Sequence, residues 1–411
     1  MAGAFVGRNA WQFLATDLAG SVLADITPWA LDPLIGPRIS NPTISEYVFA
    51  LTPDCLATVG PAVFANGRRR IVAIRNGQPV ANDKVWRIKP AGGPLSAHCK
   101  VECLGPMIRW IRRYAQDANG QVFDGPSSDG SDRGLDLPAG IIANPAMTVA
   151  AGEMLRQALA NTIANDGPME VTLGGPFSTT PTPGGNVAFA MRNLSPLRIA
   201  ELVALFTDAG ACDVIVTPLG PGSSSAGSVS AVNKAGSPVG ISFDYDTGAR
   251  NVAWAYPESD MDSFANAITY ELGTRDGAQF KNNVQRDAPG VTTDDTASRA
   301  EFGVYRDYPL FPVWSGGVKS SSNLFKMYVR RFNAELAARM VPRTIVHVMP
   351  QAGLAPEPWD DYNLGDVPGT NVANLGIDIS DASTRVVGWN TRPMRNGNDE
   401  TELLLGWNPI A

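Results

Sequence analysis

The chain has 411 residues, of which 44% are hydrophobic, with 41 glycines, 32 prolines and a formal net charge of −7. This length exceeds what one hydrophobic core normally organises and predicts several domains, while the Gly and Pro content predicts many turns and a β-rich, α+β fold. Lysine and arginine are scattered along the chain, which disfavours tight binding to nucleic acid or to an anionic membrane.

The N-terminal sequence has no basic segment leading into an apolar core and a cleavage site, and no apolar run reaches the roughly 18 residues that a membrane span needs. We therefore expect a soluble protein without a membrane anchor or a standard export signal. The cysteines Cys55, Cys99, Cys103 and Cys212 follow no framework spacing, which predicts free thiols.

Residues 1–105 form the first expected domain, a small β domain. Strands are predicted at 48–51, 69–74 and 84–88, and Asn76-Gly77 between two β-prone runs predicts a tight hairpin. The alternation over 97–103 predicts a strand with one buried face, with Cys99, Val101 and Cys103 on one face and His98, Lys100 and Glu102 on the other.

Residues 106–240 form the second expected domain, an inserted α+β domain. A polar loop at 124–134 marks the change from the β-rich sequence before it. A helix is expected from the N-cap Asn144 and Pro145 to Asp166, with an apolar stripe of Ala151, Leu155, Ala158, Leu159, Thr162 and Ile163. A second helix is expected from Ser195 to Gly210, burying Ile199, Leu202, Val203 and Phe206. The small, polar run 220–240 predicts a mobile loop or tip.

Residues 241–310 form a β-rich connecting domain with strands at 241–245 and 251–256. Residues 311–411 form a helix followed by a C-terminal β domain. Leu324, Tyr328, Phe332, Leu336 and Met340 recur every four residues and predict that helix, which ends before Pro342. Strands are expected at 343–349, 384–389 and 402–407.

Residues with catalytic or metal-binding chemistry are few. The strand alternation turns His98 away from Cys99 and Cys103, which argues against a zinc cluster, and His347 lies in mid-strand, which is typical of a structural histidine. Two carboxylate pairs, Asp294-Asp295 and Asp360-Asp361, could serve acid/base chemistry on a glycan, which requires two acids held across a sugar. Both pairs are adjacent residues in polar loops, where successive side chains point apart, which argues against this role.

Two loop motifs also fall short of known sites. Residues 220–227 lack the spacing of a nucleotide-binding loop or of a serine elbow, and no Gly-Lys dipeptide of a Walker A loop exists. Residues 244–248 resemble the start of a calcium loop, but Ala255 stands where the bidentate acid is needed. We therefore assign no catalytic, cofactor-binding or metal-binding residue and expect a protein that is not an enzyme.

The segment WDDYNLGD at 359–366 has three carboxylates beside two aromatic residues, a composition shared by a catalytic acid pair, a cation site and a polar turn. We interpret it as a turn that leads into a strand, with Trp359 and Tyr362 as packing anchors, Asp360 and Asp361 solvated or paired with an arginine, and Gly365-Asp366 forming the turn.

The last ninety residues resemble the tail-hub proteins of long-tailed bacteriophages, known as baseplate-hub or minor tail proteins, of the type found in phages of actinobacteria. The shared pattern is the aromatic and acidic stretch followed by Gly365-Asp366, Arg385, Val386, Gly388 and ELLLGW at 402–407. Residues 17–26, 69–80 and 264–277 agree more loosely, so the resemblance extends in order over most of the chain.

This resemblance implies two small barrel-like β domains of the tail-tube type, at the two ends of the chain, with α+β domains inserted. It also implies a homotrimeric ring at the virion tail tip, which presents six similar units to the six-fold tail tube. The implied partners are the tube, the distal tail protein, the tape-measure protein and the tip or fibre proteins, and DNA only in transit through the lumen. The alternatives are a tail-tip carbohydrate-binding or capsid-associated protein and a tail-associated cell-wall hydrolase.

Overall fold

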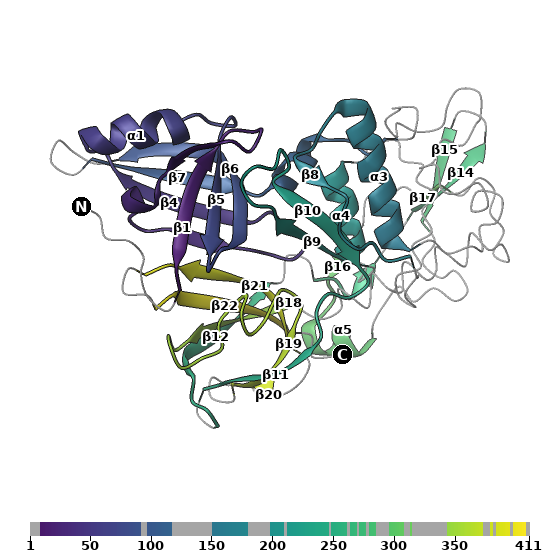
Figure 1. The fold of residues 1–411 in the computed structure, drawn as a ribbon. Helices are drawn as coiled ribbons and strands as arrows, with labels where there is room; N and C mark the ends of the chain where they lie inside the picture. The colour runs from purple at the N-terminus through teal and green to yellow at the C-terminus, as the bar shows by residue number, and fades with distance from the viewer. Residues whose placement is uncertain are drawn as a thin grey trace.

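The computed structural model describes residues 9–91, 97–116, 150–179, 198–208, 212–245, 248–260, 264–268, 271–276, 279–284, 296–307, 313–314, 343–372, 379–380, 384–394 and 398–407. Within these ranges the buried apolar side chains form three hydrophobic cores, which lie side by side (Figure 1). The first core draws on residues 11–103, the second on 107–231 and the third on 243–405. The expected α+β, β-rich fold class is confirmed.

The first core is enclosed mainly by strands. These are β1 (Trp11–Thr16), β2 (Val22–Asp25), β3 (Leu34–Gly36), β4 (Ile44–Ala50), β5 (Arg70–Arg75), β6 (Gln78–Ala91) and β7 (His98–Leu104), with a 3-10 turn at Thr27–Trp29. The predicted hairpin joins β5 to β6, and Asn76 and Gly77 have φ values of 49° and 81°, as a type I′ turn requires. Strand β7 buries Cys99, Val101 and Cys103, so the predicted alternation is confirmed.

Helix α1 (Pro53–Val63) also covers the first core, and the strand-based interpretation missed it. The Oγ1 atom of Thr52 accepts a hydrogen bond from the Cys55 backbone N–H at 3.2 Å, and Pro53 occupies the first helical position. The helix buries Cys55, Val59, Ala62 and Val63.

The second core lies between two helices and a small sheet. Its elements are a 3-10 segment at Pro106–Arg112, α3 (Ala151–Asp166), β8 (Val171–Thr172), α4 (Ile199–Asp208), β9 (Asp213–Pro218) and β10 (Gly227–Val232). Both predicted helices are confirmed, although α3 begins at Ala151, later than expected, and Asn144 lies outside the described residues. Gly167, with φ of 84°, follows the last residue of α3, where the sequence predicted the stop.

The prediction of a mobile loop over residues 220–240 was wrong. Strand β10 lies in the middle of the three-stranded sheet β8-β10-β9, and β11 (Pro238–Asp244) begins before the predicted loop ends. Val229 and Ala231 are fully buried while serines occupy the alternate positions. The two-residue period of a strand was present, but small side chains obscured it.

The third core is formed by β11, β12 (Val252–Asp260), β18 (Arg343–Pro350), β19 (Val367–Val372), β20 (Ile379–Ser380), β21 (Thr384–Arg392) and β22 (Glu400–Trp407). The strands predicted between 241 and 256 and in the last 69 residues are therefore confirmed, whereas the helix predicted at 324–340 lies outside the described residues. Strands β11 and β12 pack with the C-terminal strands; the domain boundaries at 105, 240 and 310 stay a prediction.

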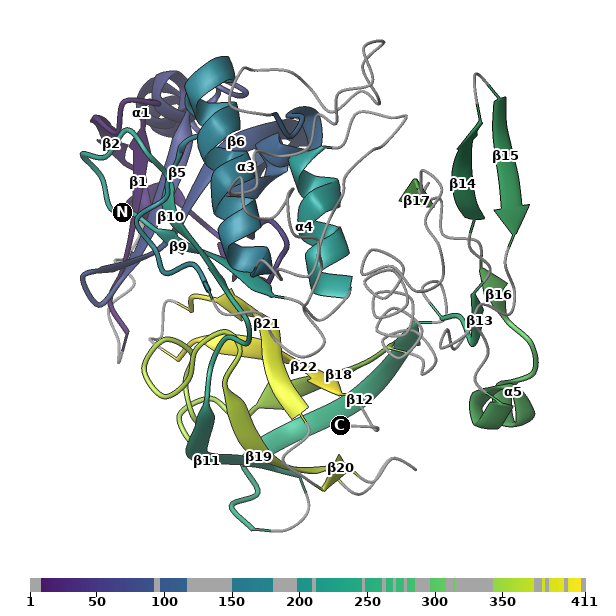
Figure 2. The ribbon, with the colours of Figure 1, turned by 90° about the vertical axis from the view of Figure 1, so that its right-hand side faces the viewer.

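Further short elements lie beyond the third core, to the right in Figure 2. They comprise α5 (Thr296–Phe302) and two small sheets, β13 (Ala267–Ile268) with β16 (Arg306–Asp307), and β15 (Gln279–Val284), β14 (Glu271–Asp276) and β17 (Val313–Trp314).

One sheet of eleven strands joins the first and third cores, in the order β12-β18-β22-β21-β3-β4-β7-β6-β5-β1-β2. The connection is the antiparallel contact between β21 and β3, where Thr391 pairs with Ile35 and a further bridge joins Arg38 to Gly388. We call this the β21–β3 contact. Strands more than 340 residues apart in sequence are thus neighbours in one sheet (Figure 1).

Gly365 permits a second close approach, between the turn before β19 and the connection from β10 to β11. The backbone of Gly365, with φ of 92°, passes Ala235 so closely that a Cβ on Gly365 would lie 2.5 Å from the Ala235 carbonyl carbon. Gly353 also has a positive φ, of 80°, but no atom lies within 4 Å of its Cβ position.

We predict that Gly365→Ala destabilises the fold much more than Gly353→Ala. Both variants place an L residue at positive φ, which costs about 1 kcal/mol, but only Gly365→Ala also forces two backbone segments apart. Urea unfolding of the two variants measures the difference. Equal losses would show that the close approach at Gly365 does not limit stability.

Candidate functional site

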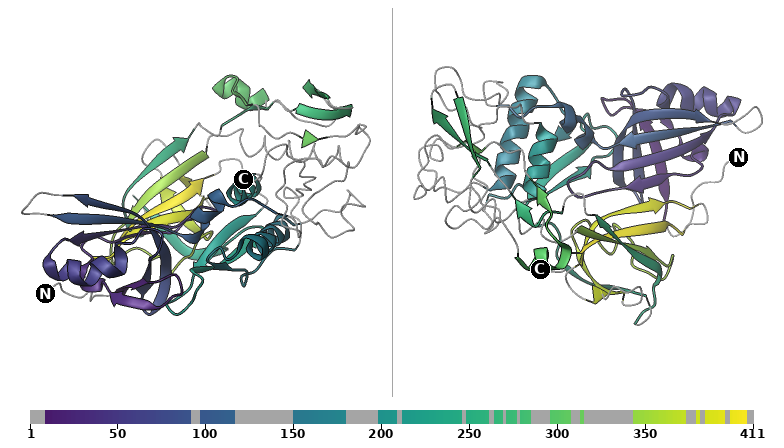
Figure 3. Two further views of the ribbon diagram at one scale, coloured as in Figure 1. Left: turned by 90° about the horizontal axis from the view of Figure 1, so that it is seen from above. Right: turned by 180° about the vertical axis from the view of Figure 1, so that it is seen from behind.

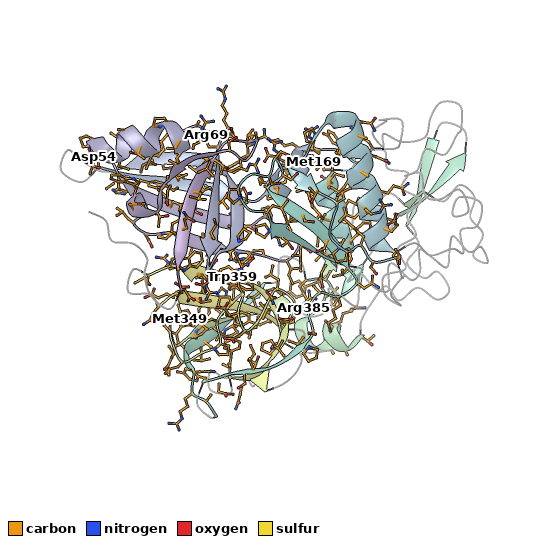
Figure 4. The ribbon with its side chains drawn as sticks, in the orientation of Figure 1. Asp54, Arg69, Met169, Met349, Trp359 and Arg385 are labelled. Atoms are coloured by element: carbon orange, nitrogen blue, oxygen red, sulfur yellow. The ribbon has the colours of Figure 1, made fainter. Side chains whose placement is uncertain are left out.

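The segment 359–366 lies where the first and third cores meet. Trp359 packs against both cores, and Figure 4 shows it between the N-terminal and C-terminal strands. The segment therefore joins two parts of the molecule that are distant in sequence, and its residues form the site described next.

A buried arginine from the first domain reaches this segment. Arg75, at the end of β5, lies 2.7 Å from Glu357, 2.6 Å from Asp360 and 3.5 Å from Asp399, and its guanidinium carbon lies 5.6 Å from the centre of the Trp359 ring. We call these five residues the Arg75 cluster. The Arg75 side chain is only 2% exposed, so its charge depends on these carboxylates for compensation.

Trp359 itself has a strained backbone. Its φ of 67° lies in the left-handed region, which costs a bulky residue on the order of 1–3 kcal/mol. Edge-to-face contacts hold the ring, with centroid distances of 5.9 Å to Trp11 of the first core and 5.2 Å to Trp389 of the third. The strained backbone of Trp359 persists because packing contacts from both cores hold its ring in place.

Asp399 connects the Arg75 cluster to the N-terminal residues of the first domain. Its carboxylate accepts a hydrogen bond from the Trp11 Nε1–H at 3.0 Å and another from the Asn9 amide at 3.1 Å. Burial raises the pKa of Asp399 to about 6, while the Trp11 hydrogen bond and the charge of Arg75 oppose the rise.

The rest of the segment forms the turn that the sequence predicted. Asp361 accepts a hydrogen bond from the Glu357 backbone N–H at 2.7 Å, and Tyr362 is buried in the third core. Asp366 accepts hydrogen bonds from the backbone N–H groups of Asn363 and Ser237, at 2.7 and 3.1 Å, and β19 begins at the next residue. Asp360 and Asp361 thus have separate structural partners.

Two further contacts attach the second core to the other two. Arg385 of β21, marked in Figure 4, forms a bidentate ion pair with Asp213 of β9 at 2.7 and 2.8 Å. From the first domain, the Ser40 backbone N–H donates to the Val214 carbonyl at 2.7 Å. Arg385 was noted in the sequence for its place in the tail-hub pattern, and this ion pair gives it a structural role.

The two histidines considered as sequence candidates for chemistry lie apart from this site. His98 begins β7 on the exposed face, opposite Cys99 and Cys103, and all four cysteines are free. His347 stacks on Tyr256 and lies within hydrogen-bond distance of Glu258 and Glu402, at 2.8 and 2.9 Å. Asp294 and Asp295 lie outside the described residues, as does part of 244–248.

The described part of the chain contains neither a metal-binding cluster nor a membrane-spanning helix. There, no three His, Cys, Asp or Glu side chains are grouped so that they could hold a metal ion. None of the helices described is long and apolar enough to cross a membrane.

A second buried carboxylate lies inside the first core. Asp83 of β6 is 1% exposed and accepts a hydrogen bond from the Ser45 hydroxyl at 2.6 Å. Burial raises the pKa of Asp83 to about 7 from its ordinary 3.8, and the Ser45 hydrogen bond opposes the rise.

Comparison with solved structures identifies proteins with the same overall fold. A 43 kDa tail protein of prophage MuSo2 from Shewanella oneidensis matches with a TM-score of 0.52 and 10% identity, over 96% of this chain and 98% of its own. A tail protein from Neisseria meningitidis matches with a TM-score of 0.50 and 12% identity, over 98% of both chains. No protein-family model and no curated protein matches by sequence.

The chain shares the fold of these two tail proteins. The match extends from one end of each chain to the other, so it includes both β domains and the α+β part between them. The expectation of tail-tube-type β domains with inserted α+β domains is therefore confirmed at the level of fold.

We predict that Arg75→Met costs about 3–5 kcal/mol of unfolding free energy, because it leaves buried carboxylates without their cation. Arg392→Met is the matched control, since Arg392 pairs with Asp32 at the surface and its loss costs about 0–1 kcal/mol. Urea unfolding of both variants measures the costs. A loss for Arg75→Met no larger than the control would contradict the role of the cluster.

We predict that Asp83→Asn stabilises the protein at pH 8. The raised pKa means that the folded state binds a proton more tightly than the unfolded state, so the stability linked to protonation is complete below pH 3.8 and is lost as pH rises through about 7. The variant should melt a few degrees higher than the parent at pH 8, with a smaller gain at pH 5. Asp54→Asn, on the exposed surface of α1, is the matched control for the loss of one negative charge. A pH-independent effect of Asp83→Asn would contradict the assignment.

Proposed function

We propose that this protein is a structural component of a phage tail, a hub whose copies form a ring. The observation that carries the proposal is the end-to-end match of its fold to two tail proteins. The chain's own architecture supports it, because both β domains contribute to one shared sheet. The C-terminal domain supplies four strands, β12-β18-β22-β21, and the N-terminal domain supplies seven, of which β3-β4-β7-β6 follow directly.

The proposed ring contains three copies and adapts the six-fold tail tube to a three-fold tip. With two β domains in each copy, a closed three-fold ring presents six similar units, and heterologous contacts that close need no filament. In this position the ring contacts the tube, the distal tail protein and the tip or fibre proteins. It also surrounds the path of the tape-measure protein and DNA, and a net charge of −7 suits a channel that DNA passes without binding.

The contacts between the cores suit such a mechanical part. Buried ion pairs at Arg75 and Arg385 and the β21–β3 contact hold the three cores in one arrangement. A ring transmits force between its partners only if its subunits keep their shape. The arrangement supports a role based on rigidity, and we propose that the protein is not an enzyme.

A carbohydrate-binding tail tip is the second candidate, because Trp254 and Tyr256 are 38% and 42% exposed. Sugars stack on open aromatic faces. The Tyr256 ring, however, lies between Trp254 and His347, at centroid distances of 5.3 and 4.5 Å, so its faces are covered. This pair is better suited to a protein contact than to a sugar.

We predict that the purified protein forms a ring with three times the chain mass of 43.6 kDa. Light scattering gives the mass, and negative-stain images show the symmetry. A monomer at every concentration, or a ring of another symmetry, would contradict the proposal. Clearing of cell walls in a zymogram would instead favour a hydrolase, and retention on a glycan array would favour the second candidate.

A further inference from the structure

Besides the short terminal strand β2, two strand edges of the shared sheet lack a partner among the described residues. Strand β12 ends the sheet and pairs only with β18. Strand β6 is long, and its two halves have different neighbours, since β5 pairs with residues 78–84 and β7 with 84–91. Val85 still exchanges backbone hydrogen bonds with Gly67 and Arg69, so among the described residues the side of 86–91 that faces away from β7 is open. Figure 3 shows β6 and β7 extending beyond the other strands of the first domain.

The two edges carry opposite charge. Glu258 projects from β12 with its side chain 66% exposed. Arg87 and Lys89 project from β6, with side chains 63% and 53% exposed, and share one acidic partner, Glu102. One carboxylate between two cations leaves the β6 edge positive.

These charged side chains lie on the same face of the sheet. Directly paired residues in antiparallel strands share a face, and Glu258 pairs with Ile345 on the side opposite the buried Val346 and Val348. On β7, Glu102 lies on the side opposite the buried Val101 and Cys103 and pairs with Arg87. The core face is continuous across the β21–β3 contact, so the outer face is continuous too.

The number of strands between the two edges favours a second copy of the chain as the partner. Eight strands run from β12 to β6, and each pair of neighbours is antiparallel. Because the number is even, β12 and β6 run in opposite directions. Rotation about an axis along the strands preserves these directions, so β6 of one copy meets β12 of the next antiparallel, and the alternation continues around a ring.

Strand β2, at the other end of the sheet, is a poorer partner for β12. It has four residues, contacts α1 and ends in Asp25, which would repel Glu258. Short edges of this kind are typical of edges that proteins protect from pairing.

We propose that β12 of one copy pairs with residues 86–91 of β6 in the next copy, with Glu258 beside Arg87 and Lys89. Trp254, which precedes Glu258 on the same face, lies along the same edge and offers aromatic surface to the incoming cations. This inference rests on the proposed ring and identifies which surfaces of the chain form it.

Charge reversal tests the pairing. The variants Glu258→Lys and Arg87→Glu/Lys89→Glu should each weaken ring assembly at least about tenfold, because each places like charges across the contact. The triple variant that combines them restores opposite charges and should recover most of the assembly. Asp54→Lys, a reversal on the exposed surface of α1, is the matched control and should assemble like the parent.

Light scattering over a range of concentrations measures assembly, and melting temperatures report folding separately. Failure of the triple variant to recover would overturn the pairing, as would normal assembly of both single-edge variants, and the ring itself would stand in either case. A parent protein that stays monomeric overturns the proposed ring and the pairing with it.

A cross-link provides a second measurement. In a variant with Glu258→Cys and Lys89→Cys, a short bismaleimide should join neighbouring copies and give covalent dimers and trimers on a denaturing gel. Either substitution alone should give none of these products, because the native cysteines are all buried. Monomers alone from the double variant, under conditions in which the ring is present, would overturn the pairing.

Discussion

Where β21 meets β3, the backbone of Gly388 lies close to Pro37 and Arg38, the two residues that follow β3, and no side chain fits between them. A Cβ on Gly388 would lie 2.8 Å from the Pro37 carbonyl oxygen and 2.5 Å from the Arg38 Cδ. Beyond this point Arg38 donates hydrogen bonds to the Trp389 carbonyl and the Asn390 side chain. One close backbone approach thus converts two half-sheets into one, and the positions of both β domains follow from it.

Charged residues then fix the angle between the cores. Arg75 joins the first core to the third, Arg385 joins the third to the second, and Lys84 lies 2.9 Å from Glu170, between the first and the second. Buried ion pairs add little net stability, because desolvation offsets most of their attraction. Their effect is on orientation, since a misplaced core would leave a buried charge without its partner. The three cores therefore have one favoured arrangement.

The sequence predicted the elements whose pattern is local. The Asn76-Gly77 turn, the alternation of β7 and the apolar stripes of α3 and α4 depend on neighbouring residues, and all four are present. Sequence reasoning missed β10, because Ser, Ala and Val alternate there with little contrast in size. It also missed α1, although Thr52-Pro53-Asp54 is a helix-start signal.

The Arg75 cluster shows where sequence reasoning stops. The segment 359–366 was correctly interpreted as a packed turn, but its arginine lies more than 280 residues away. Nothing near Arg75 in the sequence marks it as buried, because a hairpin end is ordinarily exposed to solvent. Burial there results from the β21–β3 contact, which brings the third core against the first. Pairings set by such long-range contacts become visible only when the whole fold is known.

The same contact also explains why the outer strand edges matter. Inside the chain, β21 and β3 pair through backbone groups at the boundary between two β domains, and opposite charges from Arg38 and Glu402 lie near it. At the ends of the eight-strand portion, β12 and β6 present the same kind of edge, again with opposite charges. A chain that already joins two β domains in this way needs no new type of contact to join further copies. The proposed ring thus repeats, between subunits, the edge-to-edge geometry that the structure shows inside the chain.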